Sequence, residues 1–378
     1  MKIILRYLVN LIINLVLFLL NFFIILINIT KIRSASIILF QNRRVGFGNI
    51  FASTDLAQRI FKKDILVINF FDKSRFHNIK IFDFLNIKKI VLTTSLYNKN
   101  TKSRLGEYDN FQKKNKNVFQ PLLIKIIKNL SKKKCKHFDI LSLYDLSNKK
   151  FKKLKNPKKN FCSLPDHKWQ NYYFYLINKN PKLFINKNNS VISNIISKKK
   201  KRHSICIYIR KKNFPVFDIK NFRLYNEIIR YFYKQKFIIY LTGEYSEFVK
   251  NYKDIDKFVE LPEINSQFRN DINLAMQLSS EFYVGDSGGG SWFAMYKKKS
   301  VIIGPPEETY LPNVKLFRHK LYLNGKQISR KSKKYKNFKK VMLKNNSTGD
   351  EKYMYKNKFN IKNTDNLNIL KYIKKNFK

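Results

Sequence analysis

Short apolar runs alternate with helical patterns along most of the first half of the chain. Buried strands are predicted at residues 36–41, 65–70, 89–93 and 138–143, and a helix at residues 49–61. Strands that alternate with helices are typical of a parallel sheet covered by helices. We therefore expect an α/β, Rossmann-like domain over residues 34–190.

A second and cleaner series of the same kind follows a predicted linker at residues 186–203. The predicted strands are 204–210, 237–242, 257–261, 281–284 and 300–304, and the predicted helices are 221–233, 269–279 and 291–296. Crossovers of this length favour parallel pairing. We expect a second Rossmann-like domain over residues 204–325, facing the first domain across a cleft.

The chain after residue 325 changes character. Asn324-Gly325 is a strong hairpin-turn signal, and the sequence beyond it is polar and basic. An apolar pattern at Leu367, Leu370 and Ile373 predicts a final helix. Residues 326–378 are therefore interpreted as a basic tail with a terminal helix.

The N-terminus carries a long apolar segment. Residues 7–30 contain no charged side chain, and at about 1.5 Å per residue such a helix can cross a hydrocarbon core of roughly 30 Å. Its interior polar residues fall on one helical stripe: Asn10, Asn14, Asn21 and Asn28. We expect residues 1–33 to form a membrane anchor helix. The basic residues at 31–44 outweigh Lys2 and Arg6, which predicts an inner (cytoplasmic) membrane protein with a cytosolic catalytic body.

The composition is strongly basic. The chain has 77 Lys and Arg against 25 Asp and Glu, for a net charge of +52, and 44% of its residues are hydrophobic. This excludes global disorder and an ordinary acidic cytosolic enzyme. Such a charge favours anionic partners: phosphorylated substrates, an anionic membrane surface or nucleic acid, without choosing among them. Three scattered cysteines exclude a disulfide framework and a zinc site.

A glycine-rich turn lies between a predicted strand and a predicted helix. Backbone N–H groups at such a helix start can bind an oxyanion, although a simple flexible turn has the same composition. The resemblance to the Gly-Asp-Ser-Gly-Gly motif of serine proteases fails, because no triad partners are recognisable. The candidate anion-binding residues of this turn are Asp286, Ser287, Gly288, Gly289, Gly290 and Ser291.

Further candidates lie at other strand ends, where open parallel sheets bind ligands. Arg210 leaves the first strand of the second domain and is followed by Lys211; a guanidinium suits a diphosphate because it offers a planar fork of donors. The turn after the predicted strand 237–242 is a candidate contact to a nucleotide base or ribose. The first domain carries a glycine loop after its first strand, which is a candidate for close approach to a ligand. These two sets are Thr242, Gly243 and Glu244, and Gly46, Gly48 and Asn49.

Together these pieces resemble the GT-B nucleotide-sugar glycosyltransferases, most closely the α1,2/α1,6-fucosyltransferase-like group, with heptosyltransferase-type enzymes as near neighbours. Residues 205–213 are similar to the motif whose first Arg contacts the donor diphosphate, with Arg210 in that position. Tyr208 and Lys211 depart from the His and the second Arg of that motif. The segment from Asp286 through Trp292 and Ala294 is similar to the family's Ser-rich turn and helix, and the loop ending at Asn49 to its N-terminal Gly-x-Gly-Asn element.

The resemblance implies transfer of a sugar from a nucleotide diphosphate-sugar to a glycan or lipid-linked acceptor. It implies inversion, no obligatory metal and no cofactor besides the donor substrate. A hexosyl or fucosyl donor is expected, with Arg210 and Lys211 neutralising the leaving diphosphate. The general base should come from the first domain, where Asp55, Asp72 and His77 are all candidates.

Two other classes of function stay open. A nucleic-acid-binding protein is favoured only by the charge, and no specific nucleic acid is expected because no binding motif accompanies it. A noncatalytic membrane protein could keep the same two-domain fold.

Overall fold

A computed structural model of the chain forms two units, Met1–Pro157 and Lys158–Lys378. This division assigns residues 169–197, which were predicted as part of the first domain or as linker, to the second unit. The structure describes residues 2–41, 47–62, 64–72, 81–95, 119–154, 168–183, 185–197, 202–210, 221–261, 269–287, 289–304, 311, 313–318, 320–328, 332–334, 337, 359–362 and 366–377.

The first unit is built on a parallel sheet of order β3-β2-β1-β4. Its strands are β1 (Ile37–Gln41), β2 (Ile65–Asp72), β3 (Lys88–Ser95) and β4 (Lys136–Asp139). The first three confirm the predicted strands. The fourth corrects the prediction of a strand at 138–143, because β4 ends at Asp139 and a helix starts there. Asp139 accepts a hydrogen bond from the Ser142 N–H (2.7 Å), which caps the helix and ends the strand.

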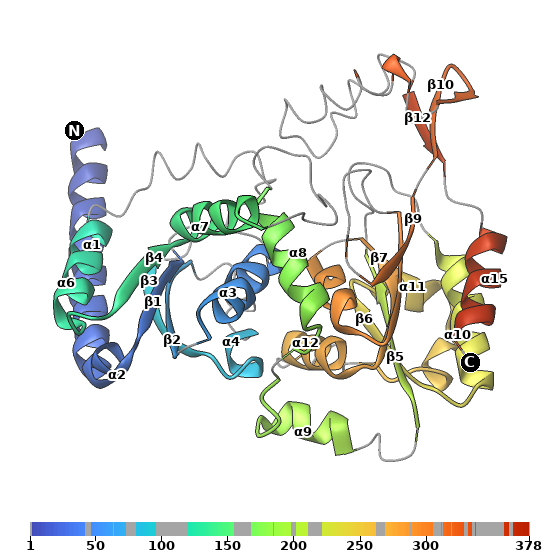
Figure 1. The fold of residues 1–378 in the computed structure, drawn as a ribbon, viewed down its shortest axis with the longest axis horizontal. Coiled ribbons are helices and arrows are strands. Elements are labelled where there is room, and N and C mark those ends of the chain that lie inside the picture. The colour runs from blue at the N-terminus through green and yellow to red at the C-terminus, as the bar shows by residue number, and fades with distance from the viewer. Residues whose placement is uncertain are drawn as a thin grey trace. The chain divides into compact units, whose positions relative to one another are not determined.

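Helices cover both faces of this sheet. They are α1 (Lys2–Ile27), α2 (Ile29–Ser34), α3 (Phe47–Phe61), α4 (Ile81–Phe84), α6 (Gln120–Leu130) and α7 (Ile140–Lys152). Alternate residues of β1 and β2, such as Ile38 and Leu66, point to one face and pack with Ile25 of α1 and Ile127 of α6. Helices α3 and α7 contact each other and β1 (Figure 1).

The predicted N-terminal helix exists as α1, but it is part of the first unit. It packs against β3 and α6, with Leu17, Asn21 and Ile25 buried. The Asn21 amide pairs with the backbone of Thr93 in β3: Nδ2 donates to the Thr93 carbonyl (2.7 Å), and the Thr93 N–H donates to Oδ1 (2.9 Å). Across the described residues, no helix has the length and apolar character needed to cross a membrane. The structure thus gives no support to a separate spanning anchor, since one face of α1 is committed to the sheet.

The second unit contains a five-stranded sheet of order β6-β5-β7-β8-β9 in which all neighbours are parallel. Its strands are β5 (Ser204–Ile209), β6 (Ile238–Gly243), β7 (Phe282–Asp286), β8 (Lys299–Ile303) and β9 (Val314–Phe317). The predicted α/β class with parallel sheets is therefore confirmed. The strand predicted at 257–261 is instead the short 3₁₀-helix η4 (Ile255–Lys257) and a single bridge between Tyr240 and Glu260.

Several helices surround this sheet (Figure 1). They are α8 (Trp169–Lys179), α9 (Ser190–Ser197), α10 (Phe222–Lys234), α11 (Ser246–Asn251), α12 (Arg269–Ser279), the 3₁₀-helix η5 (Gly289–Tyr296) and α15 (Asn366–Asn376). One core joins Ile205 and Ile207 of β5 to Ile228 of α10 and Ile373 of α15. The predicted terminal helix is therefore confirmed. The predicted linker partly folds as α9, which packs against α12 and buries Ile192.

A small antiparallel sheet of order β11-β10-β12 also belongs to this unit. Its strands are β10 (Lys320–Leu323), β11 (Lys326–Gln327) and β12 (Phe359–Lys362). Asn324 and Gly325 both have positive φ (49° and 76°), so the predicted hairpin turn is confirmed. The predicted tail 326–378 thus contributes β11, β12 and α15 to the folded unit.

Candidate functional site

The strongest candidate site lies at the carboxyl edge of the large sheet in the second unit. Parallel pairing sets Tyr208 of β5 opposite both Thr242 of β6 and Gly285 of β7. The residues that follow these strands therefore emerge side by side. In open parallel sheets this edge is where ligands bind.

Asp286 is the buried centre of this edge. Its side chain is 2% exposed; Oδ2 accepts the backbone N–H of Arg210 (2.9 Å), and Oδ1 accepts the Tyr225 hydroxyl (2.7 Å). Burial raises the pKa of Asp286 to about 6, although the Arg210 N–H, the Tyr225 hydroxyl and the Arg210 charge oppose this rise. Asp286 therefore ties the end of β5 to the end of β7 and positions the residue that follows β5.

Arg210 is half-buried, and its guanidinium turns toward the start of the glycine-rich turn. Its Nη1 donates a hydrogen bond to the Ser287 carbonyl (3.0 Å). The Ser287 N–H in turn donates to the Ile303 carbonyl (3.3 Å). A guanidinium carries five N–H donors, so this contact occupies only part of the fork. The structure thus brings together two candidates that the sequence singled out separately: Arg210, and the glycine-rich turn that begins with Asp286 and Ser287.

The glycine-rich turn is packed tightly against Tyr208. A Cβ added at Gly290 would lie 2.6 Å from Gln277 Oε1 and 2.7 Å from the Tyr208 ring, and a Cβ at Gly285 would lie 2.4 Å from the Tyr208 carbonyl. Gly289 and Gly290 begin η5, Ser291 is buried, and Gly288 lies outside the described residues. Glycine at 285 and 290 is therefore required by space.

Tyr208 lies in β5, between β6 and β7, and its ring packs against Gly290. Burial raises the pKa of Tyr208 to about 12, while the Arg210 charge and the Gly290 N–H act to lower it. Burial likewise raises the pKa of Tyr225, with the Asp286 charge adding to the effect. Both phenols keep their protons at neutral pH, which lets Tyr225 donate to Asp286.

The turn after β6 is held by side chains that the sequence analysis missed. Gly243 has φ +87°; its N–H donates to Asn273 Oδ1 (2.9 Å), and Asn273 Nδ2 donates to its carbonyl (3.3 Å). Gln277, one helical turn further along α12, donates to Asn273 Oδ1 (3.0 Å). Asn273 and Gln277 are four residues apart on the predicted helix 269–279, and this spacing could have indicated in the sequence that the two side chains interact. Tyr225 had no comparable signal.

The two remaining residues of this turn have different surroundings. The Thr242 side chain is fully buried, and its hydroxyl lies 3.1 Å from Cys206 Sγ, so it packs inside the sheet. Glu244 is exposed beyond the strand end, and its N–H donates to the Ile209 carbonyl (2.7 Å). Lys211 lies outside the described residues.

The first unit holds the candidates for a general base and the glycine loop. Asp55 is buried in α3, where it makes an ion pair with Arg59 (2.6 Å). Asp72 is the last residue of β2, and only its backbone is described; His77 lies outside the described residues. Gly48 is buried in the first turn of α3, Asn49 is a helical residue whose side chain is not described, and Gly46 lies outside the described part.

A buried polar network underlies the carboxyl end of β1 in the same unit. Gln41 donates from Nε2 to Thr54 Oγ1 (2.7 Å), and Asn69 of β2 donates to Gln41 Oε1 (3.0 Å). The three side chains are nearly inaccessible to solvent. The sequence analysis missed this network, which braces α3 against both strands where the glycine loop begins.

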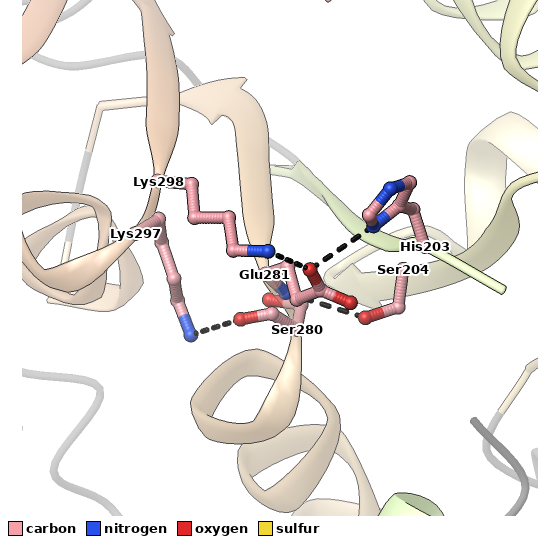
Figure 2. Close-up of polar contacts among 6 residues, drawn as sticks. All are labelled: His203, Ser204, Ser280, Glu281, Lys297 and Lys298. Carbon is pink, nitrogen blue, oxygen red and sulfur yellow. Dashed lines mark hydrogen bonds and ion pairs between the residues drawn. The ribbon is translucent and has the colours of Figure 1, made fainter. Parts of the chain in front are cut away.

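A second polar cluster lies at the opposite, amino-terminal edge of the large sheet (Figure 2). Glu281 Oε2 contacts His203 Nδ1 (3.1 Å) and Lys298 Nζ (2.6 Å). Partial burial acts to raise the pKa of Glu281, but the hydrogen bonds and charges of Lys298 and His203 outweigh it and lower the pKa. Lys297 donates to the carbonyls of Leu278 and Ser280 (2.8 Å each). These contacts join strand beginnings and lie at the other end of β5 and β7 from Arg210.

No metal centre emerges from the described residues, which contain no group of three His, Cys, Asp or Glu side chains arranged to hold an ion.

No protein-family model matches the chain, and no curated protein matches it. Several solved structures are similar to it. E. coli heptosyltransferase WaaC with ADP-2-deoxy-2-fluoro heptose has 11% identity and a TM-score of 0.39, with 82% of this chain and 100% of that chain covered. E. coli ADP-heptose lps heptosyltransferase II has 11% identity and a TM-score of 0.41, with the same coverage. A family 9 glycosyl transferase from Veillonella parvula has 9% identity and a TM-score of 0.40, with 82% and 89% covered.

These identities and TM-scores are too low to carry an argument about the family or activity of this chain. Heptosyltransferases, which the sequence also resembles, are among the similar structures, whereas the fucosyltransferase-like resemblance gains no support. The fold assignment therefore rests on the two parallel sheets of the chain itself, and the candidate site rests on its own geometry.

Proposed function

We propose that this chain is a glycosyltransferase that moves a sugar from a nucleotide diphosphate-sugar to a glycan or lipid-linked acceptor. The observation that carries the proposal is the position of Arg210. Its backbone is held by Asp286 and its guanidinium by the Ser287 carbonyl, so a cation is fixed beside a glycine-rich turn at a ligand-binding sheet edge.

The chemistry asked of this edge is stabilisation of a leaving diphosphate. Negative charge grows on the diphosphate as the bond to the sugar breaks, and donors that are already fixed in place stabilise it without reorganising. In the proposal, Arg210 supplies the charge, with or without Lys211, and the helix start after Gly288 to Gly290 completes the cradle. Such an arrangement can replace a bound metal ion in neutralising the diphosphate, so the proposed reaction is metal-independent.

Other parts of the reaction are proposed from the sequence resemblance. The exposed Glu244 at the end of β6 is the candidate contact to the ribose or base of the donor. The general base is one of Asp55, Asp72 and His77, and the stereochemical outcome is inversion. The donor sugar is a hexose, fucose or heptose, and the work is done at the cytoplasmic face of a membrane.

Calorimetric titration with ADP, UDP and GDP tests the binding part of the proposal. We expect one nucleotide to bind, and Arg210→Ala to weaken its binding at least about tenfold, because a hydrogen bond to a charged group contributes roughly 1.5–3 kcal/mol. Arg202→Ala is the matched control: Arg202 is exposed at the amino-terminal edge and donates to the Lys236 carbonyl (2.8 Å). Unchanged affinity and turnover in Arg210→Ala would show that the site is assigned wrongly.

A further inference from the structure

Helix α1 presents an apolar face that the rest of its unit leaves uncovered. Of the sixteen large apolar side chains that are exposed among the described residues, eleven lie on this helix. They are Leu8, Val9, Leu11, Ile12, Leu15, Val16, Leu19, Leu20, Phe23, Leu26 and Ile27, with exposed fractions from 42% at Leu26 to 65% at Ile27. Single exposed apolar residues are ordinary, but a continuous apolar surface along one helix marks an interaction site.

The polar side chains of α1 that the structure describes, Asn14 and Asn21, do not belong to its exposed face. Asn21 is buried and bonds both backbone groups of Thr93, on the edge strand β3. Asn14 is half-buried, and so is Asn28, the residue that follows α1. A helix that borders water carries its polar residues outward. Over the described side chains of α1 this order is reversed, which indicates that the medium outside that part of the helix is apolar.

Positive charge lies on two helices that contact α1. Lys31 and Arg33 are exposed in α2, directly after α1, and Lys125 and Lys128 are exposed in α6, which packs against α1. The first acidic residue of the whole chain is Asp55. An apolar stripe flanked by Lys and Arg, without carboxylates, is complementary to a surface that is apolar inside and anionic at its rim.

We propose that the first unit docks on an anionic lipid surface through the outward face of α1. The helix lies along the interface and does not cross it, because its other face is held by Asn21 on β3 and by Phe18 against Phe119 (ring centroids 5.2 Å apart). Crossing would carry the polar edge of the sheet into hydrocarbon, where unpaired backbone groups are costly. This inference does not depend on the sugar-transfer reaction.

Sedimentation of the full chain with lipid vesicles tests the proposal. We expect binding to vesicles of phosphatidylcholine mixed with phosphatidylglycerol, and weaker binding to phosphatidylcholine alone. The triple variant Leu15→Gln, Leu19→Gln, Phe23→Gln should lower the partition coefficient more than about tenfold. The double variant Leu141→Gln, Leu367→Gln is the matched control, because it removes exposed leucines from other helices and should bind as the wild type does.

Two further measurements keep the test decisive. The triple variant alters exposed positions only, so its thermal midpoint without vesicles should match the wild type. Lys31→Glu, Arg33→Glu leaves the apolar face intact and should remove the preference for anionic vesicles. Failure of the wild type to bind either vesicle, or equal binding by the triple variant, overturns the proposal. A wild-type dimer that the triple variant converts to monomer, without vesicle binding, would assign the face to a second copy instead.

Discussion

At the scale of single residues, the second unit is organised around one buried carboxyl group. Asp286 accepts from the Arg210 backbone and from Tyr225, and Arg210 in turn reaches the Ser287 carbonyl. The position of the half-buried Arg210 therefore depends on a side chain that is itself 2% exposed. Because Asp286 fixes the backbone of Arg210, the guanidinium needs less reorganisation when an anion binds.

The raised pKa of Asp286 leads to a prediction about stability and pH. The folded state holds the proton more tightly than the unfolded chain, because burial raises the pKa from the usual range near 4 to about 6. Stability from this group is present in full below pH 4 and is lost as the pH rises through 6. Relative to Asp286→Asn, which cannot titrate, the wild type should lose about 2 kcal/mol of unfolding free energy between pH 4 and pH 7.

Urea unfolding at closely spaced pH values measures this difference. Glu227→Gln is a suitable control, because Glu227 lies in an exposed pair with Arg223 on the surface of α10 and should leave the pH profile unchanged. Parallel profiles for the wild type and Asp286→Asn would contradict the assignment of the titration to Asp286.

At the scale of elements, helix α1 closes the open edge of a sheet. Strand β3 is the last strand of its sheet, and an edge strand presents unpaired N–H and C=O groups. The Asn21 amide satisfies both groups of Thr93 in the way that a neighbouring strand would. The helix therefore acts as the cover of this edge over part of its length.

Replacement of Asn21 tests this role. Asn21→Leu leaves the partly buried Thr93 N–H and C=O without these partners, which should lower the unfolding free energy by about 1–3 kcal/mol. The Thr93 amide should also exchange its hydrogen faster with solvent. Asn28→Leu is the control, because Asn28 follows α1 and its Nδ2 bonds locally, to the Ile24 carbonyl (2.8 Å), and not to β3. Equal stability of the wild type and Asn21→Leu would show that the pairing contributes nothing.

At the scale of the whole molecule, the charge balance agrees with the proposed reaction. A chain with 77 basic and 25 acidic residues creates a field that attracts phosphorylated substrates before any specific contact forms. The same field suits an anionic lipid surface. The net positive charge of the chain and the fixed guanidinium of Arg210 therefore both favour binding of a phosphorylated substrate.

This balance leads to a prediction about metal ions. If the protein itself neutralises the leaving diphosphate, sugar transfer should proceed at an unchanged rate after treatment with a chelator. The measurement compares transfer rates with and without EDTA, and with Mg²⁺ restored in excess. An absolute cation requirement would defeat the metal-independent mechanism.

Most of the strands and helices could be predicted from the sequence alone. Apolar periodicity is a local property that can be recognised in short windows of sequence. It therefore predicted the strands around residues 37–41, 65–72 and 204–209 and the terminal helix α15. It also placed Arg210 and the glycine-rich turn at strand ends, because strand boundaries are read from the same windows. Where two signals overlap, as in the apolar run at 138–143, a single cap at Asp139 decided the boundary.

The contacts between residues far apart in the sequence could not be predicted and are known from the fold. Tyr225 and Asp286 are 61 positions apart, and Asn21 and Thr93 are 72 apart. No local pattern encodes such pairs, since they depend on strand order and on the side of the sheet that each helix covers. The same reason explains α1: the asparagine stripe was visible in the sequence, but the side of the helix that faces the protein was set by packing on β3.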